Sequence, residues 1–103
     1  MIADLKDKAT LDSLTGLYNR YYCQVTVMDY LNQEGQDKLS AFLLIDLDNF
    51  KLVNDNLGHR VGDQVLIEVG RVLKNHFRET DIVSRFGGDE FVVLMKDIKM
   101  QMY

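Results

Sequence analysis

Residues 84–91 read SRFGGDEF, and this stretch decides the fold. Its glycine pair, residues 87–88, stands between a short apolar run and the longer apolar run of residues 91–95. A two-residue hairpin turn needs positive φ angles, which glycine adopts without steric cost, so the pattern predicts a β-hairpin that turns at the glycine pair. Asp89 and Glu90 are then placed at an exposed tip. On its own, an acidic pair at a turn is more often solvated surface charge than a functional site.

Another strand is predicted at residues 41–45 (AFLLI), an unbroken apolar run of the kind that is buried on both faces of a sheet. The run is followed by Asp46-Leu47-Asp48. The two-residue period of a strand puts both of these carboxylates on one face and the leucine on the other.

Helical segments are predicted around these strands. Asn19 is a suitable N-cap for a helix over residues 20–32. Residues 49–58 are typical of a short helix or turn that closes at a glycine. Residues 61–77 carry apolar side chains at the spacing of a core-facing helix.

The order of these elements predicts an α/β domain of the α+β type. We expect a β-α-β-β core with a mainly antiparallel central sheet flanked by helices. Residues 1–11 resemble the frayed end of an amphipathic helix, and we expect them to form a linker helix that leads into a domain over residues 12–103.

The composition narrows the classes of function. A chain of 103 residues is one domain at most, and its net charge of −4 offers no basic surface for a nucleic acid polymer or an anionic membrane. No apolar stretch approaches the ~20 residues that span a bilayer. Cys23 is the only cysteine, which excludes an intrachain disulfide, favours a reducing, cytoplasmic setting and suits a buried apolar position.

The acids of the predicted strand and of the hairpin suggest a metal site. If the strand that ends at Asp46 lies beside the hairpin, several carboxylates converge, and a bound cation would offset their repulsion. Oxygen ligands select Mg²⁺ or Mn²⁺ over Zn²⁺, which points to nucleotide phosphoryl chemistry. Because neighbouring strand residues face opposite ways, we expect different tasks for Asp89 and Glu90: one shares a metal with Asp46, and the other binds a second ion or deprotonates a hydroxyl. Ordinary strand-end acids remain the alternative.

Residues 50–63 are rich in polar groups that suit a nucleotide. An amide such as that of Asn54 and a carboxylate such as that of Asp63 can together recognise guanine. The alternatives are that Asp63 is only an N-terminal helix charge and that His59 is only a loop residue.

Taken together, these stretches resemble the GGDEF domain, the diguanylate cyclase family. The resemblance rests on four blocks in order along the chain: DSLTGLYNR at residues 12–20, IDLDNFKLVND at 45–55, GHRVGD at 58–63 and RFGGDEF at 85–91. It implies a ferredoxin-like, nucleotide-cyclase palm-like fold. It also implies an activity, the condensation of two GTP molecules into cyclic di-GMP with release of pyrophosphate, in an antiparallel homodimer.

The resemblance also implies roles for individual residues. By position, Asp46 and Asp89 are side-chain metal ligands and Leu47 contributes its carbonyl. Glu90 is the companion acid, for a second metal or for the attacking hydroxyl. The positions implied for substrate are Asn54 and Asp63 at guanine, His59 near the nucleotide, and Lys51 with the backbone around Asn49 and Phe50 at phosphate.

A further block, Arg78-Glu79-Thr80-Asp81, has the RxxD pattern and the spacing to Gly87 of the family's product-binding inhibitory site. Arg78 would grip a phosphate or guanine edge and Asp81 would accept guanine donors. Read without the resemblance, the RxxD pattern is weak and is more often a helix-end ion pair.

One departure from the family concerns the C-terminus. The full domain continues past the hairpin with another helix and further strands, so this chain, which stops at Tyr103, is expected to be truncated. The alternatives to a cyclase are a module that binds GTP or cyclic di-GMP without turnover and, more distantly, another metal-dependent nucleotidyl transferase with a related sheet.

Overall fold

The computed structural model describes residues 10–99, so the expected linker helix over residues 1–11 lies almost wholly outside the described residues. Along the described part, the elements are α2 (Arg20–Gln33), β1 (Ala41–Asp46), α3 (Phe50–Leu57), α4 (His59–His76), β2 (Ile82–Gly87) and β3 (Glu90–Met95). No helix among them is long and apolar enough to cross a membrane.

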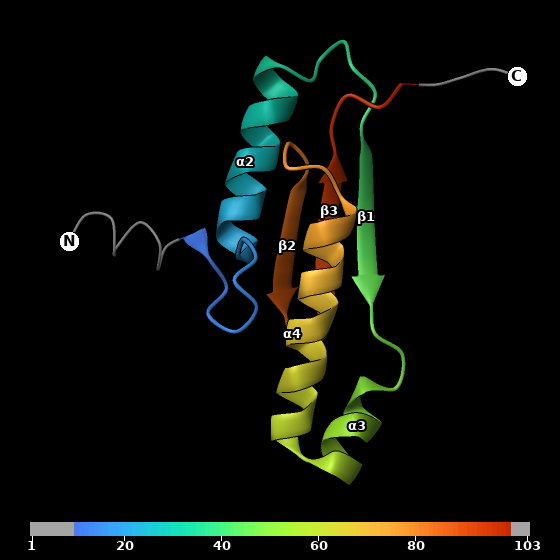
Figure 1. Ribbon diagram of the computed structural model, residues 1–103. Coiled ribbons are helices and arrows are strands. Elements are labelled where there is room, and N and C mark those ends of the chain that lie inside the picture. Colours follow the sequence, from blue (N-terminus) through green and yellow to red (C-terminus); the bar gives the residue numbers. More distant parts are fainter. Residues whose placement is uncertain (1–9, 100–103) are drawn as a thin grey trace, which may run out of the picture.

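Within the described residues, the strands form one sheet in the order β1-β3-β2. The central strand, β3, pairs antiparallel with both neighbours, so β1 and β2 run in the same direction on either side of it (Figure 1). The predicted α+β fold with a mainly antiparallel sheet is therefore confirmed.

The helix boundaries follow from local capping. The Asn19 side chain accepts a hydrogen bond from the amide of Tyr22 at 2.8 Å, which confirms the predicted N-cap of α2. The short helix α3 ends at Gly58, whose φ of 89° favours glycine. The next helix, α4, begins at His59, two residues before the apolar stripe from which it was predicted.

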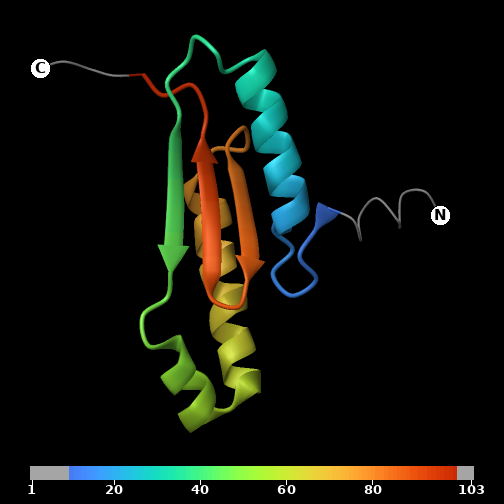
Figure 2. The ribbon, with the colours of Figure 1, turned by 180° about the vertical axis from the view of Figure 1, so that it is seen from behind.

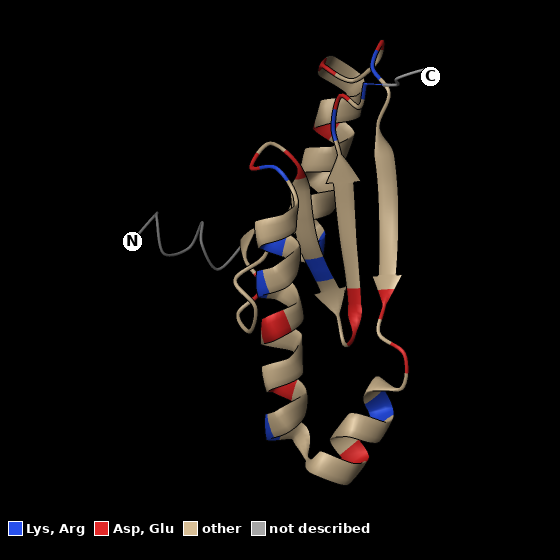
Figure 3. Cartoon of the chain, turned by 45° about the vertical axis from the view of Figure 1, so that its right-hand side comes forward, with Lys and Arg blue, Asp and Glu red and all other residues tan. Residues whose placement is uncertain are grey.

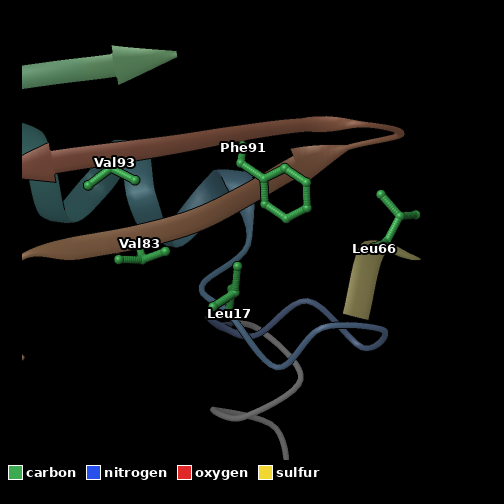
Figure 4. Packing of buried hydrophobic residues seen from close by; sticks show 5 residues of the cluster. All are labelled: Leu17, Leu66, Val83, Phe91 and Val93. Carbon is green, nitrogen blue, oxygen red and sulfur yellow. The ribbon is translucent and has the colours of Figure 1, made fainter. Parts of the chain in front are cut away.

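Each face of the sheet has its own apolar cluster. On one face, Leu66 of α4 belongs to a cluster with the buried side chains of Leu17, Val83, Phe91 and Val93 (Figure 4). The opposite face packs against α2 through Ile82, Val92 and Leu94, which meet Cys23 and Tyr30. The Cys23 side chain is buried, as predicted, and its burial raises the pKa of the thiol.

The predicted burial of β1 on both faces is wrong. Leu43 and Ile45 pack against the α4 cluster, but Phe42 and Leu44 on the opposite face are 58% and 65% exposed. The physical reason is that β1 lies at the edge of the sheet, whereas α2 lies along β2 (Figure 2). One face of β1 is therefore left without a helix over it.

Candidate active site

Two acids from different strands meet at one end of the sheet. Asp46, the last residue of β1, is the cross-strand partner of Glu90, the first residue of β3. One step further out, the amide of Leu47 donates a hydrogen bond to the carbonyl of Asp89 at 3.3 Å. Figure 3 shows acidic positions next to each other at these strand ends. The juxtaposition of strand and hairpin acids that the sequence predicted is therefore present.

Electrostatics tie Asp46 most closely to Asp89. The charge of Asp89 is the main cause that raises the pKa of Asp46 above its ordinary value of 3.8. Desolvation, a hydrogen bond between the two side chains and the charges of Glu90 and Asp48 act in the same direction. Asp89 thus has the stronger effect on Asp46, and Glu90, the cross-strand partner of Asp46, adds a weaker effect through its charge. The two neighbouring acids occupy different positions relative to Asp46.

The hairpin turns one residue later than the sequence suggested. Gly87 still belongs to β2 and pairs with Glu90, so the two loop residues are Gly88 and Asp89. A register shift between Arg85 and Gly87 causes the difference. Gly87 and Gly88 have φ angles of 127° and 51°, in the region that disfavours residues with a side chain. Asp89 is therefore carried on the turn itself.

The oxygen atoms at this end of the sheet fit a divalent cation that takes its remaining ligands from a substrate and from water. Within residues 10–99, no group of three or more His, Cys, Asp or Glu side chains is arranged to hold a metal ion alone. Mg²⁺ does not require such a cage, because it commonly takes one or two carboxylates and completes its shell with water and phosphate oxygens. Asp46 and Asp89, two carboxylates held together against their repulsion, match that pattern.

The predicted nucleotide residues lie on α3 and α4, which pack against each other. Asn54 and Phe50 of α3 both approach Gly62 of α4: a Cβ atom added there would lie 1.8 Å from Asn54 Oδ1 and 3.3 Å from Phe50 Cζ. His59 and Asp63, on the first turns of α4, are exposed.

Gly62 lies against two of the predicted site residues but was not itself predicted. Only a residue without a side chain leaves room for Asn54 in this place. The other two residues predicted to lie near phosphate, Phe50 and Lys51, differ in their burial. The Phe50 ring packs against the main core cluster, so the ring is not available to a ligand, and Lys51 is exposed on α3.

A family model described as "Diguanylate cyclase, GGDEF domain" matches residues 9–103. The chain belongs to the GGDEF domain family. Among curated relatives, it is 39% identical to diguanylate cyclase DgcS of Shewanella oneidensis, over 90% of this chain and 32% of DgcS. It is also 45% identical to the cyclic di-GMP phosphodiesterase NbdA of Pseudomonas aeruginosa, over 89% of this chain and 12% of NbdA.

Solved GGDEF structures agree with the fold. The coiled coil and GGDEF domain of DgcB from Caulobacter crescentus, in complex with cyclic di-GMP, superposes with a TM-score of 0.89 at 26% identity, over 95% of this chain and 52% of that one. A form of TpbB from Pseudomonas aeruginosa that comprises only the GGDEF domain gives a TM-score of 0.82 at 40% identity, over 87% of this chain and 53% of that one. The chain thus spans about half of each solved chain and a third or less of these curated relatives.

In this GGDEF domain, the RxxD residues form an ion pair between α4 and β2. Asp81 accepts from Arg78 Nη2 at 2.9 Å, from Arg78 Nε at 3.2 Å and from the Arg78 amide at 3.0 Å. It also accepts from the amide of Lys96 at 3.1 Å, while Arg78 donates to the Lys96 carbonyl. The side chain of Asp81 is only 1% exposed, and that of Arg78 is 54% exposed. Asp81 therefore has a structural role, and Arg78 is the member that solvent reaches.

Proposed function

We propose that this GGDEF domain provides one half of a diguanylate cyclase centre, in which two GTP molecules condense to cyclic di-GMP. The observation that carries the proposal is the contact of Asp46 with Asp89 at the open end of the sheet, where their repulsion favours a shared cation. Each of two domains holds one GTP. The 3′-oxygen of each nucleotide forms a bond to the α-phosphorus of the other, and the bond from that phosphorus to pyrophosphate breaks.

Asp46, Asp89 and the Leu47 carbonyl are the groups that would hold Mg²⁺ or Mn²⁺. A bound ion of this kind neutralises triphosphate oxygens and favours attack at the α-phosphorus. Glu90, which is exposed and is the cross-strand partner of Asp46, would bind a second ion or take the proton of the attacking hydroxyl.

The other proposed substrate contacts lie on the helices that follow β1. Helix α3 begins after Asn49, whose φ is 60° and whose side chain makes no capping hydrogen bond. The first amides of α3, together with Lys51, are therefore suited to phosphate oxygens. Asn54 and Asp63 are suited to the guanine edge, with His59 near the nucleotide.

Product inhibition is a separate part of the proposal. The half-exposed guanidinium of Arg78 is suited to a phosphate or guanine edge of cyclic di-GMP, held in place by Asp81. Calorimetric titration of cyclic di-GMP against the wild-type chain and Arg78→Gln tests it. Weaker binding in a variant that remains folded supports the site, and equal binding rejects it.

A second candidate is a module that binds GTP or cyclic di-GMP and does not turn it over. One observation favours it: NbdA, which is named a cyclic di-GMP phosphodiesterase, contains a region 45% identical to this chain.

One experiment separates the two candidates. The chain is incubated with GTP and Mg²⁺, cyclic di-GMP is measured by chromatography, and GTP binding is measured by calorimetry, with the TpbB domain as assay control. Formation of cyclic di-GMP that is lost in Asp89→Asn and Glu90→Gln but kept in Glu68→Gln supports the cyclase. Binding without product supports the module, and neither binding nor product rejects both.

A further inference from the structure

The segment before α2 lies along the free edge of β2. Tyr18 forms an isolated bridge with Ser84, through hydrogen bonds from the Tyr18 amide to the Val83 carbonyl at 3.3 Å and from the Arg85 amide to the Tyr18 carbonyl at 3.0 Å. At the start of this segment, Asp12 accepts from the amide of Thr15 at 2.9 Å and from its hydroxyl at 2.8 Å. The Asp12 carboxylate is therefore held in place by its own turn.

A single guanidinium joins this turn to the hairpin. Arg85 Nη1 donates to the two carboxylate oxygens of Asp12 at 3.1 and 3.3 Å. Arg85 Nη2 and Nε donate to the carbonyl of Gly88 at 2.8 and 3.1 Å. The side chains of Arg85 and Asp12 are only 14% and 17% exposed, so solvent screens this ion pair less than one at the surface.

Besides this clamp, the hairpin turn is held by the hydrogen bond from the Leu47 amide to the Asp89 carbonyl and by the pairing of Gly87 with Glu90. Around Gly87 and Gly88, a Cβ atom would meet nothing within 4 Å, and both residues have the broad conformational freedom of glycine. Asp89 follows directly and is the second loop residue. The Arg85 clamp on the Gly88 carbonyl therefore limits the freedom of the peptide that carries Asp89.

We infer that Asp12 and Arg85 are positioning residues for Asp89: Asp12 orients the Arg85 guanidinium, which holds the Gly88 carbonyl and so keeps the Asp89 carboxylate beside Asp46. The inference rests on the proposed function in one respect, since the carboxylate that is positioned is the proposed metal ligand. Residues that orient a metal ligand commonly change metal affinity about 10- to 100-fold when they are lost. Here the effect passes through a backbone carbonyl, so a smaller change is expected.

The test uses the full chain labelled with ¹⁵N and titrated with Mn²⁺, whose paramagnetism broadens nearby amide signals. In the wild-type chain, the amides of Leu47 and Asp89 should broaden first. Asp12→Asn and Arg85→Gln should each raise the Mn²⁺ concentration for half-broadening by about 3- to 10-fold. The double variant should be no weaker than Arg85→Gln alone, because Asp12 acts through Arg85. Glu68→Gln, which breaks the exposed pair with Arg71, is the matched control and should bind as the wild type does.

A second readout separates this inference from the metal site. The ¹⁵N heteronuclear NOE of Gly88 and Asp89 should fall in both single variants, while the amides of Val92 and Val93 in the buried strand stay unchanged. If Mn²⁺ broadens neither Leu47 nor Asp89 in the wild type, the metal proposal fails, and the NOE alone then decides this inference. The inference is overturned if the NOE values of Gly88 and Asp89 are the same in the variants as in the wild type. It is also overturned if the wild type binds Mn²⁺ and the variants bind it with the same affinity.

Arg85→Lys covers the case in which Arg85→Gln does not fold. Lysine keeps the charge but lacks the fork that reaches Asp12 and Gly88 together. If Arg85→Lys folds and the NOE of Gly88 falls, the positioning role is supported. If Arg85→Lys keeps the wild-type NOE at Gly88 and the wild-type Mn²⁺ affinity, the positioning role is contradicted.

Discussion

Asp46 and Asp89 contact each other where β1 stops and the hairpin turns, and this contact raises the pKa of Asp46. The two residues are 43 positions apart in sequence, and the pairing of β1 with β3 brings them together. In the absence of a cation, the charge of Asp89 destabilises the ionised form of Asp46. The arrangement therefore costs stability at neutral pH, as expected of a site shaped for a ligand.

Asp46→Asn is expected to raise the melting temperature at about pH 7. The folded chain binds the Asp46 proton more tightly than the unfolded chain does, so stability falls as the pH rises from 3.8 through the raised folded-state pKa. The gain from Asp46→Asn should therefore be full above that pKa and vanish below 3.8. Melting curves at about pH 7 and about pH 3 measure it, with Asp55→Asn as control. Added Mg²⁺ should stabilise the wild type more than Asp46→Asn. A variant that is less stable than the wild type at neutral pH would contradict the repulsion.

Gly62→Ala should separate nucleotide binding from stability. The new methyl group would lie 1.8 Å from Asn54 Oδ1, so the amide must turn away from its position. Alanine gains about 1 kcal/mol over glycine in a helix, which offsets part of the strain. GTP affinity should fall about 3- to 10-fold, as for one lost hydrogen bond, with unfolding free energy within about 1 kcal/mol of the wild type.

Gly70→Ala is the matched control for this prediction. It lies on the same helix, but its Cβ would approach Thr15 at 3.2 Å and not Asn54. For Gly70→Ala, calorimetry should show an unchanged affinity for GTP, and urea unfolding should show a loss of stability from the altered packing. Equal loss of GTP affinity in both variants would mean that Gly62→Ala does not act through the Asn54 amide.

Local patterns predicted the elements, because each depends on residues near in sequence. The Asn19 cap, the α3 stop at Gly58 and the hairpin are of this kind. The exposure of Phe42 and Leu44 was not foreseen, since an apolar run does not reveal which faces a neighbouring element covers. The turn shifted by one residue because a register irregularity cannot be recognised from glycines alone.

In the candidate site, too, the features set by local sequence were predicted and those set by tertiary packing were not. The acids at the end of β1 and at the hairpin were predicted to meet, because strand ends and a turn locate them. The bond between Asp12 and Arg85, 73 residues apart, had no periodic signal. The space that Gly62 provides for Asn54 depends on how two helices pack, which composition and spacing leave open.

Asp81→Asn should destabilise the chain at neutral pH. Burial alone would raise the pKa of Asp81, but hydrogen bonds from Arg78 and from the Lys96 amide outweigh it and lower the pKa below 3.8. The stabilisation is thus present above 3.8 and lost as the pH falls through the lowered value. A loss of about 2 kcal/mol is expected at about pH 7, as for hydrogen bonds to a buried charge. Urea unfolding at neutral and acidic pH measures it, with the exposed Glu79→Gln as control. A difference that persists unchanged at acidic pH would show that charge is not the cause.

Leu44→Ala and Leu94→Ala compare the same truncation on adjacent strands of one sheet face. Leu94 is 2% exposed in the cluster under α2, whereas Leu44 is 65% exposed. Loss of the buried leucine should cost about 2–5 kcal/mol, and loss of the exposed one about 0.5 kcal/mol. Urea unfolding at two protein concentrations measures both. If Leu44→Ala proves as costly as Leu94→Ala, the bare face of β1 is covered in solution, and a cost that grows with protein concentration would identify a second copy of the chain as the cover.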